Sequence, residues 1–255
     1  MIKSLITMYP ELLSIGPFTI HTFGLMMALG FLAAGIAAYY GFRRKGLDTE
    51  NLFWLVIATA VGGVLGSKIH YLLLNLSELG DTPLRSAFSG AGLVWYGGMV
   101  GGLVTALMVM TFLKLPWGKV LDAAAPAIAL GYAFGRMGCF LNGDDYGITS
   151  TLPWAMGFPR GSPPTPPGIT VQPTQLYEVG AAILIFFVLL FLWPRLKRDW
   201  ELFCAYLVMA GTERFLVEFV RFQRDGQTQQ RLLALATAIA AAVALVWIHT
   251  RPERR

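Results

Sequence analysis

The chain has 255 residues, of which 55% are apolar and 14% charged, and its formal net charge is +5. A soluble protein this apolar would lack the charged surface that keeps it dispersed, so the composition excludes an ordinary soluble domain and indicates a polytopic membrane protein. The net positive charge does not indicate a nucleic-acid partner, because most of it lies in short segments between apolar stretches.

Seven stretches meet the requirement of a membrane span for roughly 20 mostly apolar residues. They cover residues 19–41, 52–75, 91–113, 118–140, 176–194, 201–221 and 231–249. The sequence therefore predicts an all-α integral membrane protein of seven transmembrane helices, forming one domain over residues 1–255. Residues 1–17 lack the order of a cleavable signal, so we expect them to form a short surface arm and the first span to be retained.

The cations in the connecting segments predict the orientation. One side carries Arg43, Arg44, Lys45, Lys114, Lys119, Arg195, Lys197, Arg198, Arg251, Arg254 and Arg255, and the other carries Lys3, Arg85, Arg160, Arg221, Arg224 and Arg231. The side with more cations is expected to be cytoplasmic. The N-terminus then lies outside and the C-terminus in the cytoplasm, as an odd number of spans requires.

Three cations lie within the predicted spans: Lys68, Arg136 and Arg214. Each falls in the later half of a span that runs outward, so all three are expected in the outer half of the membrane. A charge at that depth is costly and marks a functional site by default. We interpret the three as a shared anion site; the alternative is that each side chain snorkels independently to the interface.

Other polar residues are expected at the same depth, in the segments 21–24, 94–102 and 172–178 that open spans one, three and five. In span six, Arg214, Glu218 and Arg221 are spaced i, i+4 and i+7 and so share one helix face. Glu218 is expected to neutralise either arginine, and a purely structural ladder of ion pairs is the alternative.

Glycines recur at small-xxx-small spacing, which lets helices approach closely. The pairs are Gly62/Gly66, Gly97/Gly101 and Gly98/Gly102. We expect Gly101 and Gly102 to serve packing. Gly97 and Gly98, beside Tyr96 at the mouth of a span, could also expose their backbone to a ligand.

The longest extramembrane segment is the outer loop at about 141–175, whose proline-rich part, residues 162–168, should run extended. It could act as a lid, as a docking surface for a polypeptide or as an inert connection. His21, His70 and His249 are too dispersed to argue for a metal. The two cysteines are expected toward opposite membrane faces, which argues against a disulfide.

Five motifs occur in the order of a known family. They are Phe23-Gly24-Leu25-Met26, Tyr96-Gly97-Gly98, the segment 135–143 that reads Gly-Arg-Met-Gly-Cys-Phe-Leu-Asn-Gly, the segment 172–178 that reads Gln-Pro-Thr-Gln-Leu-Tyr-Glu, and the segment 214–221 that reads Arg-Phe-Leu-Val-Glu-Phe-Val-Arg. On these motifs the chain resembles the prolipoprotein diacylglyceryl transferases. Seven spans with the N-terminus outside also agree with that family.

The resemblance implies an enzyme that moves the diacylglyceryl group of phosphatidylglycerol onto the lipobox cysteine thiol of an exported preprotein and releases glycerol phosphate. It also implies the bacterial inner membrane, an active site toward the outer leaflet, and no cofactor or metal. Arg136 would hold the lipid phosphate, Arg214 would assist lipid binding or departure of the leaving group, and Asn142 would shape the headgroup pocket. The other substrate-binding candidates are Gly138, Gly97, Gly98, Lys68, Gln175 and Glu218.

Four positions depart from the family's usual residues: Tyr96 replaces a histidine proposed as the base, Phe23 a tyrosine, Cys139 an asparagine and Asp144 a glutamate. Tyr96 could order a water or act as a base, but a tyrosine pKa near 10 suits that role poorly. Asp144 or Glu218 could take the proton instead. Cys139 is interpreted as a small packing residue, because no activating base is visible.

Two other functions remain open. The substitutions at Tyr96 and Phe23 are compatible with a catalytically divergent homologue that binds lipid or preprotein. The cations are compatible with an anion transporter, but a transporter should show polar groups in both halves of the bundle and often repeated halves. Charge confined to the outer half favours chemistry at the outer leaflet.

Overall fold

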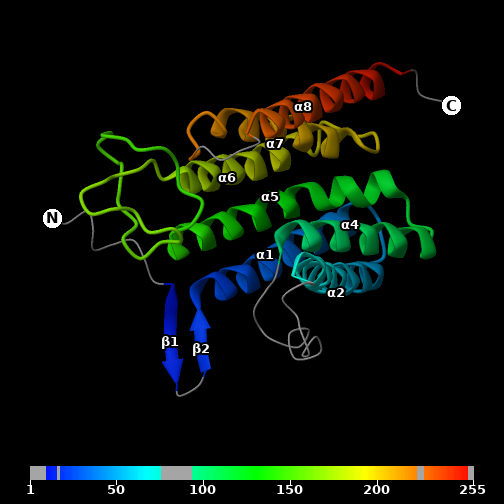
Figure 1. The fold of residues 1–255 in the computed structure, drawn as a ribbon. Helices are drawn as coiled ribbons and strands as arrows, with labels where there is room; N and C mark the ends of the chain where they lie inside the picture. Colours follow the sequence, from blue (N-terminus) through cyan, green and yellow to red (C-terminus); the bar gives the residue numbers. More distant parts are fainter. Residues whose placement is uncertain (1–9, 16–17, 76–93, 223–226, 252–255) are drawn as a thin grey trace. The chain divides into compact units, whose positions relative to one another are not determined.

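The computed structural model describes residues 10–15, 18–75, 94–222 and 227–251, and Figure 1 labels their elements. Part of the predicted arm lies outside the described residues, as do the cations Lys3, Arg85, Arg224, Arg254 and Arg255. The strands are β1 (Glu11–Ile15) and β2 (Phe18–His21). The helices are α1 (Thr22–Arg44), α2 (Thr49–Leu74), α4 (Trp95–Phe112), α5 (Trp117–Asn142), α6 (Thr174–Leu192), α7 (Glu201–Val217) and α8 (Gln227–Thr250).

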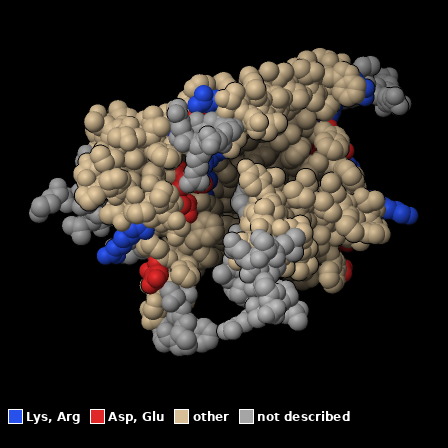
Figure 2. Space-filling view, in the orientation of Figure 1, with Lys and Arg blue, Asp and Glu red and all other residues tan. Residues whose placement is uncertain are grey.

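Each of these seven helices lies over one of the predicted apolar stretches, with ends that differ by a few residues. Five of them are long and apolar enough to cross a membrane, namely α1, α2, α5, α6 and α8. The α4 helix is apolar but shorter. Most of the helix surface visible in Figure 2 carries no charged side chain. The described residues therefore form the helices of a membrane protein with five clear candidate spans.

The all-α prediction was incomplete, because β1, in the stretch expected to be an arm, pairs antiparallel with β2, which overlaps the start of the first predicted span. Leu13 pairs with Ile20, and a bulge lies between Glu11 and Leu13. The backbone N–H of Thr22 donates to the carbonyl of Pro10 (3.0 Å), so the hairpin closes where α1 begins. Each strand is only four or five residues long, too short for its alternation to stand out in the sequence.

The chain divides into two compact units, residues 1–41 with 121–255 and residues 42–120. In the first unit, α7 packs against α6 and α8 (Figure 1). Glycines bring α1 and α5 together in this unit. A Cβ on Gly30 would lie 3.0 Å from Phe134, and one on Gly138 would lie 3.1 Å from the Phe23 ring. Small residues thus let these backbones approach closely.

A buried carboxylate fixes the start of α7. Trp200, which precedes the helix, has a left-handed backbone (φ 79°) and makes no side-chain cap. Instead Asp122 of α5, fully buried, accepts from the backbone N–H groups of Trp200 (3.1 Å) and Phe203 (2.9 Å). A negative charge at a helix N-terminus satisfies free donors and complements the helix dipole.

Within the described part of the second unit, the helices α2 and α4 pack against each other in antiparallel orientation, with glycines at their contact. A Cβ on Gly66 would meet the carbonyl of Gly97 and lie 2.8 Å from the Cα of Gly101. The Ser67 hydroxyl donates to the carbonyl of Val94 (2.8 Å) beside the start of α4. The predicted small-xxx-small packing is therefore present in this unit.

The segment 143–173 between α5 and α6 folds on itself without a helix or a named strand. Its centre is an apolar cluster of Tyr146, Phe158 and Val171, in which the first two rings stack at 5.4 Å. The proline-rich part is tied to this cluster, because the Tyr146 hydroxyl donates to the carbonyl of Pro163 (2.8 Å) and the Phe158 N–H donates to Thr165 Oγ1 (2.7 Å).

Candidate functional site

Six charged side chains gather where α5, α6 and α7 meet the 143–173 segment. This ion cluster consists of Arg136, Asp145, Glu178, Arg214, Glu218 and Arg221. All six lie in the first unit. Three guanidinium groups and three carboxylates form it, so its formal charges cancel.

Glu178 of α6 stands at the centre of the ion cluster, with its side chain fully buried. Its Oε2 pairs with Nη2 of Arg136, and its Oε1 lies 3.5 Å from Nη1 of Arg214 and 3.9 Å from Nη1 of Arg221. The Tyr132 hydroxyl also donates to Oε1 (2.8 Å). One carboxylate thus holds three guanidinium groups together, which makes its own burial tolerable.

Asp145 joins two of the arginines from the loop side. Its Oδ2 lies 3.1 Å from Nη1 of Arg136, and its Oδ1 lies 3.2 Å from Nη2 of Arg221. The Thr174 hydroxyl donates to the Asp145 carbonyl (3.0 Å) and ties this residue to the start of α6. The Asp145 backbone is left-handed (φ 56°), a conformation that aspartate tolerates better than most residues.

Glu218 contacts both neighbouring arginines, as the spacing predicted. Its Oε1 pairs with Nη2 of Arg214 and lies 3.9 Å from Nη1 of Arg221. The predicted continuous helix through residue 221 was wrong, because α7 ends at Val217 and Arg221 forms a backbone bridge with Gly147. Arg221 therefore enters the ion cluster from beyond the helix and not from its face.

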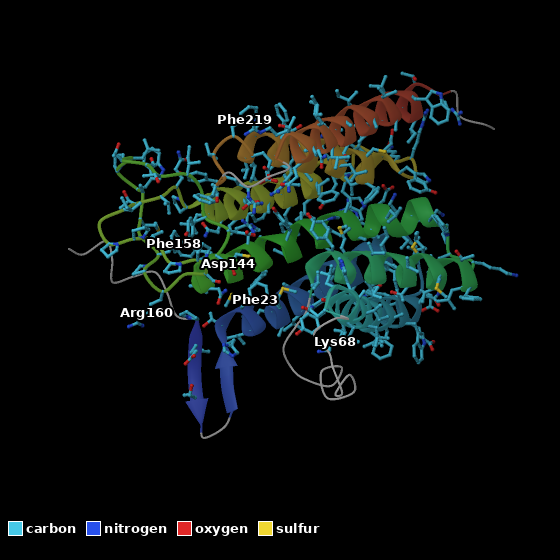
Figure 3. All side chains as sticks on the ribbon, viewed as in Figure 1. Phe23, Lys68, Asp144, Phe158, Arg160 and Phe219 are labelled. Atoms are coloured by element: carbon cyan, nitrogen blue, oxygen red, sulfur yellow. The ribbon has the colours of Figure 1, made fainter. Side chains whose placement is uncertain are left out.

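The loop after α5 begins with a glycine turn that orients Asn142 and Asp144. Gly143 has a left-handed backbone (φ 74°), which ends α5 in the usual glycine manner. The Asn142 side chain donates to Asp144 Oδ2 (2.6 Å), and the buried Gln175 side chain donates to the Asp144 carbonyl (2.6 Å). Asp144 Oδ1 is inaccessible to solvent and has no hydrogen-bond partner among the described residues. Figure 3 labels Asp144 at this end of α5.

Cys139, interpreted from the sequence as a packing residue, also contacts the ion cluster. Nη1 of Arg136 lies 3.5 Å from its sulfur, and one ligand atom from each of Cys139, Asp144 and Asp145 lies within 4.8 Å of the others. Residues of these types can bind a metal ion. Here a guanidinium already contacts Cys139 and Asp145, so a second cation would be repelled, and the arrangement does not support a metal site.

Arg136 and Arg214 are the two arginines for which an anion was predicted. A guanidinium has five N–H groups in a planar fork, and Nε of Arg136 is buried with no hydrogen-bond partner in the described residues. Arginine in this form is suited to bidentate contacts with phosphate oxygens. Arg136 and Arg214 come from different helices and share Glu178. The two arginines predicted to share an anion are thus brought together by one carboxylate, and their binding of an anion stays a prediction.

The remaining predicted site residues occupy other places. Gly138 faces Phe23 and Met26 of α1. Lys68, Tyr96, Gly97 and Gly98 belong to the second unit. Arg136 and Arg214 belong to the first unit, so the predicted grouping of Lys68 with them stays a prediction.

Within the second unit, the four predicted residues have different surroundings. The Lys68 ammonium lies 5.3 Å from the Tyr71 ring centroid, and Tyr96, in the first turn of α4, is 57% exposed. A Cβ on Gly97 would overlap Gly66 and His70, whereas one on Gly98 would lie 3.3 Å from the Gly63 carbonyl. Both glycines thus face α2, and Gly97 is the more closely packed.

Four residues of this region were not among the predicted site residues, namely Glu178, Asp145, Arg221 and Tyr132. Glu178 carried a usable signal, because a carboxylate in the first turns of an apolar span must be paired. Arg221 was assigned to the outer side and to the ladder with Arg214, so its contact with Asp145 was not foreseen. Tyr132 and Asp145 carried no comparable signal.

Comparison with known proteins gives a consistent result. A family model described as "Prolipoprotein diacylglyceryl transferase" matches residues 10–248. Three relatives carry the name phosphatidylglycerol–prolipoprotein diacylglyceryl transferase. The one from Clostridium tetani is 33% identical over 84% of this chain and 86% of its own length. Those from Coxiella burnetii and Bordetella avium are 30% and 35% identical, each over 96% of this chain and 97% of their own.

Proposed function

Since the chain belongs to the prolipoprotein diacylglyceryl transferase family, we propose that it transfers the diacylglyceryl group of phosphatidylglycerol to the lipobox cysteine thiol of exported prolipoproteins. Glycerol phosphate is the other product. The ion cluster is the observation that supports a site for a phosphate-bearing lipid. Its arginines lie in the 135–143 and 214–221 motifs on which the resemblance rests.

In this proposal Arg136 and Arg214 bind the lipid phosphate. The sulfur of the prolipoprotein cysteine attacks the glyceryl carbon next to that phosphate. A carbon–sulfur bond forms, the carbon–oxygen bond to phosphate breaks, and its electron pair leaves with glycerol phosphate. Because the leaving phosphate gains negative charge, guanidinium groups already fixed by Glu178 stabilise it without reorganising.

The thiol must lose its proton to become an effective nucleophile. Asp144 is the acceptor we propose, because its carboxylate lies within 4.8 Å of a carboxylate oxygen of Asp145 in the ion cluster and is oriented by the Asn142 side chain, which donates to Oδ2. Glu218 suits this role less well, because it is already paired with Arg214 and Arg221. Tyr96 is retained as a second candidate that orders a water or the thiol.

We also propose the finer topology: seven spans, the N-terminus outside, the C-terminus in the cytoplasm, and an ion cluster toward the outer leaflet of the bacterial inner membrane. The excess of cations in one set of connecting segments supports this orientation. Arg136 lies near the C-terminal end of α5, which runs outward in this arrangement.

The test is an assay with purified protein, phosphatidylglycerol vesicles and a lipobox peptide, in which peptide mass and released glycerol phosphate are measured. A diacylglyceryl mass gain with stoichiometric release is the expected result. Absence of product, with phosphatidylglycerol bound by the wild-type protein but not by Arg136→Ala, would instead identify a lipid-binding relative without activity.

A further inference from the structure

We propose that the turn Leu152–Ala155 of the 143–173 segment lies in the interface of the lipid bilayer, with Trp154 as its anchor. The turn is closed by a hydrogen bond from the Ala155 N–H to the Leu152 carbonyl (2.9 Å). Trp154 is 54% exposed and Leu152 is 39% exposed, although the apolar cluster beneath them is buried. Two large apolar side chains are thus left uncovered on a folded loop.

A hydrogen bond fixes the position of Trp154 relative to a candidate membrane span. Its indole Nε1–H donates to the hydroxyl of Tyr177 (2.6 Å). Tyr177 lies in the first turn of α6, which begins at Thr174. The indole therefore lies at the level where this apolar helix starts.

Tyr177 also lies at the head of the exposed apolar stripe of α6. Residues at its helical spacing are Gly180, Leu184, Phe187 and Phe191. Leu184, Phe187 and Phe191 are 60% to 63% exposed. The other side of the helix carries the buried Glu178, Ala182, Ile185 and Leu189. An exposed stripe this apolar, on a candidate span, must face lipid.

The length of α6 sets the depth of its first turn. Its 19 residues span about 28 Å at 1.5 Å per residue, close to the roughly 30 Å of a bilayer's hydrocarbon core. Because α6 is no longer than the hydrocarbon core is thick, its first turn lies at the boundary between hydrocarbon and headgroups. Tryptophan is enriched at that boundary, because its ring is apolar and its N–H is a donor.

The occupant that these observations favour is the lipid surface and not a peptide. The Trp154 ring continues the lipid-facing stripe of α6, and its one donor is already used by Tyr177. Such an anchor would hold the loop that carries Asp144 and Asp145 at the level of lipid headgroups. The inference concerns membrane contact and does not depend on the proposed reaction.

Fluorescence of Trp154 can test the proposal. The protein has seven tryptophans, so the Trp154 signal is obtained by subtracting the emission of a Trp154→Phe variant from that of the wild-type protein in the same vesicles. Phosphatidylcholine brominated near its headgroup should remove most of this signal, phosphatidylcholine brominated near the chain ends should remove little, and aqueous acrylamide should quench it weakly.

Trp193→Phe provides the matched control, because Trp193 is 7% exposed at the other end of α6 and its signal should respond little to any of the three quenchers. Strong quenching of Trp154 by acrylamide, with no response to either brominated lipid, would overturn the proposal. Protection of Trp154 from acrylamide only after a lipobox peptide is added would also overturn it, and would identify a peptide-docking surface.

Discussion

Glu178 of α6 and Arg136 of α5 form an ion pair in which the first side chain is fully buried and the second is 9% exposed. The same carboxylate also contacts Arg214 and Arg221. A carboxylate and a guanidinium withdrawn from solvent to this degree stabilise each other only as a pair, so removal of either leaves an uncompensated charge.

Glu178→Gln should therefore lower stability and abolish transfer together. Loss of one partner of a buried ion pair costs about 3–5 kcal/mol, and the three guanidinium groups would lose the anchor they share. Thermal unfolding in detergent and the rate of peptide lipidation measure the two effects. Glu201→Gln, which removes the buried carboxylate that pairs with His249 at the other end of α7, is the matched control and should retain activity; wild-type rates in Glu178→Gln would contradict the role assigned to Glu178.

Arg136→Ala and Arg214→Ala should each sharply reduce lipidation without preventing membrane insertion. Each removes a cation from the proposed phosphate site, and hydrogen bonds to charged groups are worth about 1.5–3 kcal/mol. Arg136→Lys keeps the charge but not the planar fork, so it should recover only part of the activity. Full activity in either alanine variant would refute the shared phosphate site.

Arg221→Ala tests the arginine that enters from beyond α7. Its contacts with Asp145 and Glu178 hold the loop against the cluster, so we expect the transfer rate to fall about 10- to 100-fold, corresponding to the loss of one or two charge-assisted contacts. Arg160→Ala, an exposed loop arginine labelled in Figure 3, is the control and should leave the rate unchanged. Equal losses of transfer rate in Arg221→Ala and Arg160→Ala would show that Arg221 acts only through the net charge of the protein surface.

Tyr96→Phe tests the residue found where the family often has histidine. If the hydroxyl orders the thiol or a water, the substitution should slow transfer while binding of phosphatidylglycerol persists. The pre-steady-state rate at saturating lipid measures the transfer step separately from the binding of phosphatidylglycerol. Unchanged rates would exclude the Tyr96 hydroxyl from proton transfer and leave Asp144 as the acceptor to test.

Gly66→Val should destabilise the α2–α4 pair. Its side chain would meet the carbonyl of Gly97 and the Cα of Gly101, and overpacking of this kind costs about 1–3 kcal/mol. A lower midpoint of thermal unfolding in detergent is the expected result. Gly102→Ala is the control, because its Cβ would have nearest neighbours at 3.4 Å; equal midpoints for both variants would show that close packing at Gly66 is unimportant.

The sequence allowed the helices to be predicted well because each is encoded by a continuous apolar stretch. The stretch at 176–194, for example, corresponds to α6 at Thr174–Leu192. The small-xxx-small pairs likewise predicted close approach of helices, since that spacing is a local property of the chain, whereas the structure identified α2 and α4 as the partners. The β1–β2 hairpin was missed, because two strands of four or five residues leave little periodic pattern.

The sequence by itself thus determined that the chain is a helical membrane protein, and its motifs indicated the family. It also singled out Arg136 and Arg214 as cations within predicted spans, which would require a function or a partner. Only the tertiary structure decided the partners, because Glu178, Asp145 and Arg221 are far apart along the chain and meet through the packing of α5, α6 and α7 with the loop. Apolar periodicity is a property of neighbouring residues, whereas an ion cluster depends on which helices lie side by side.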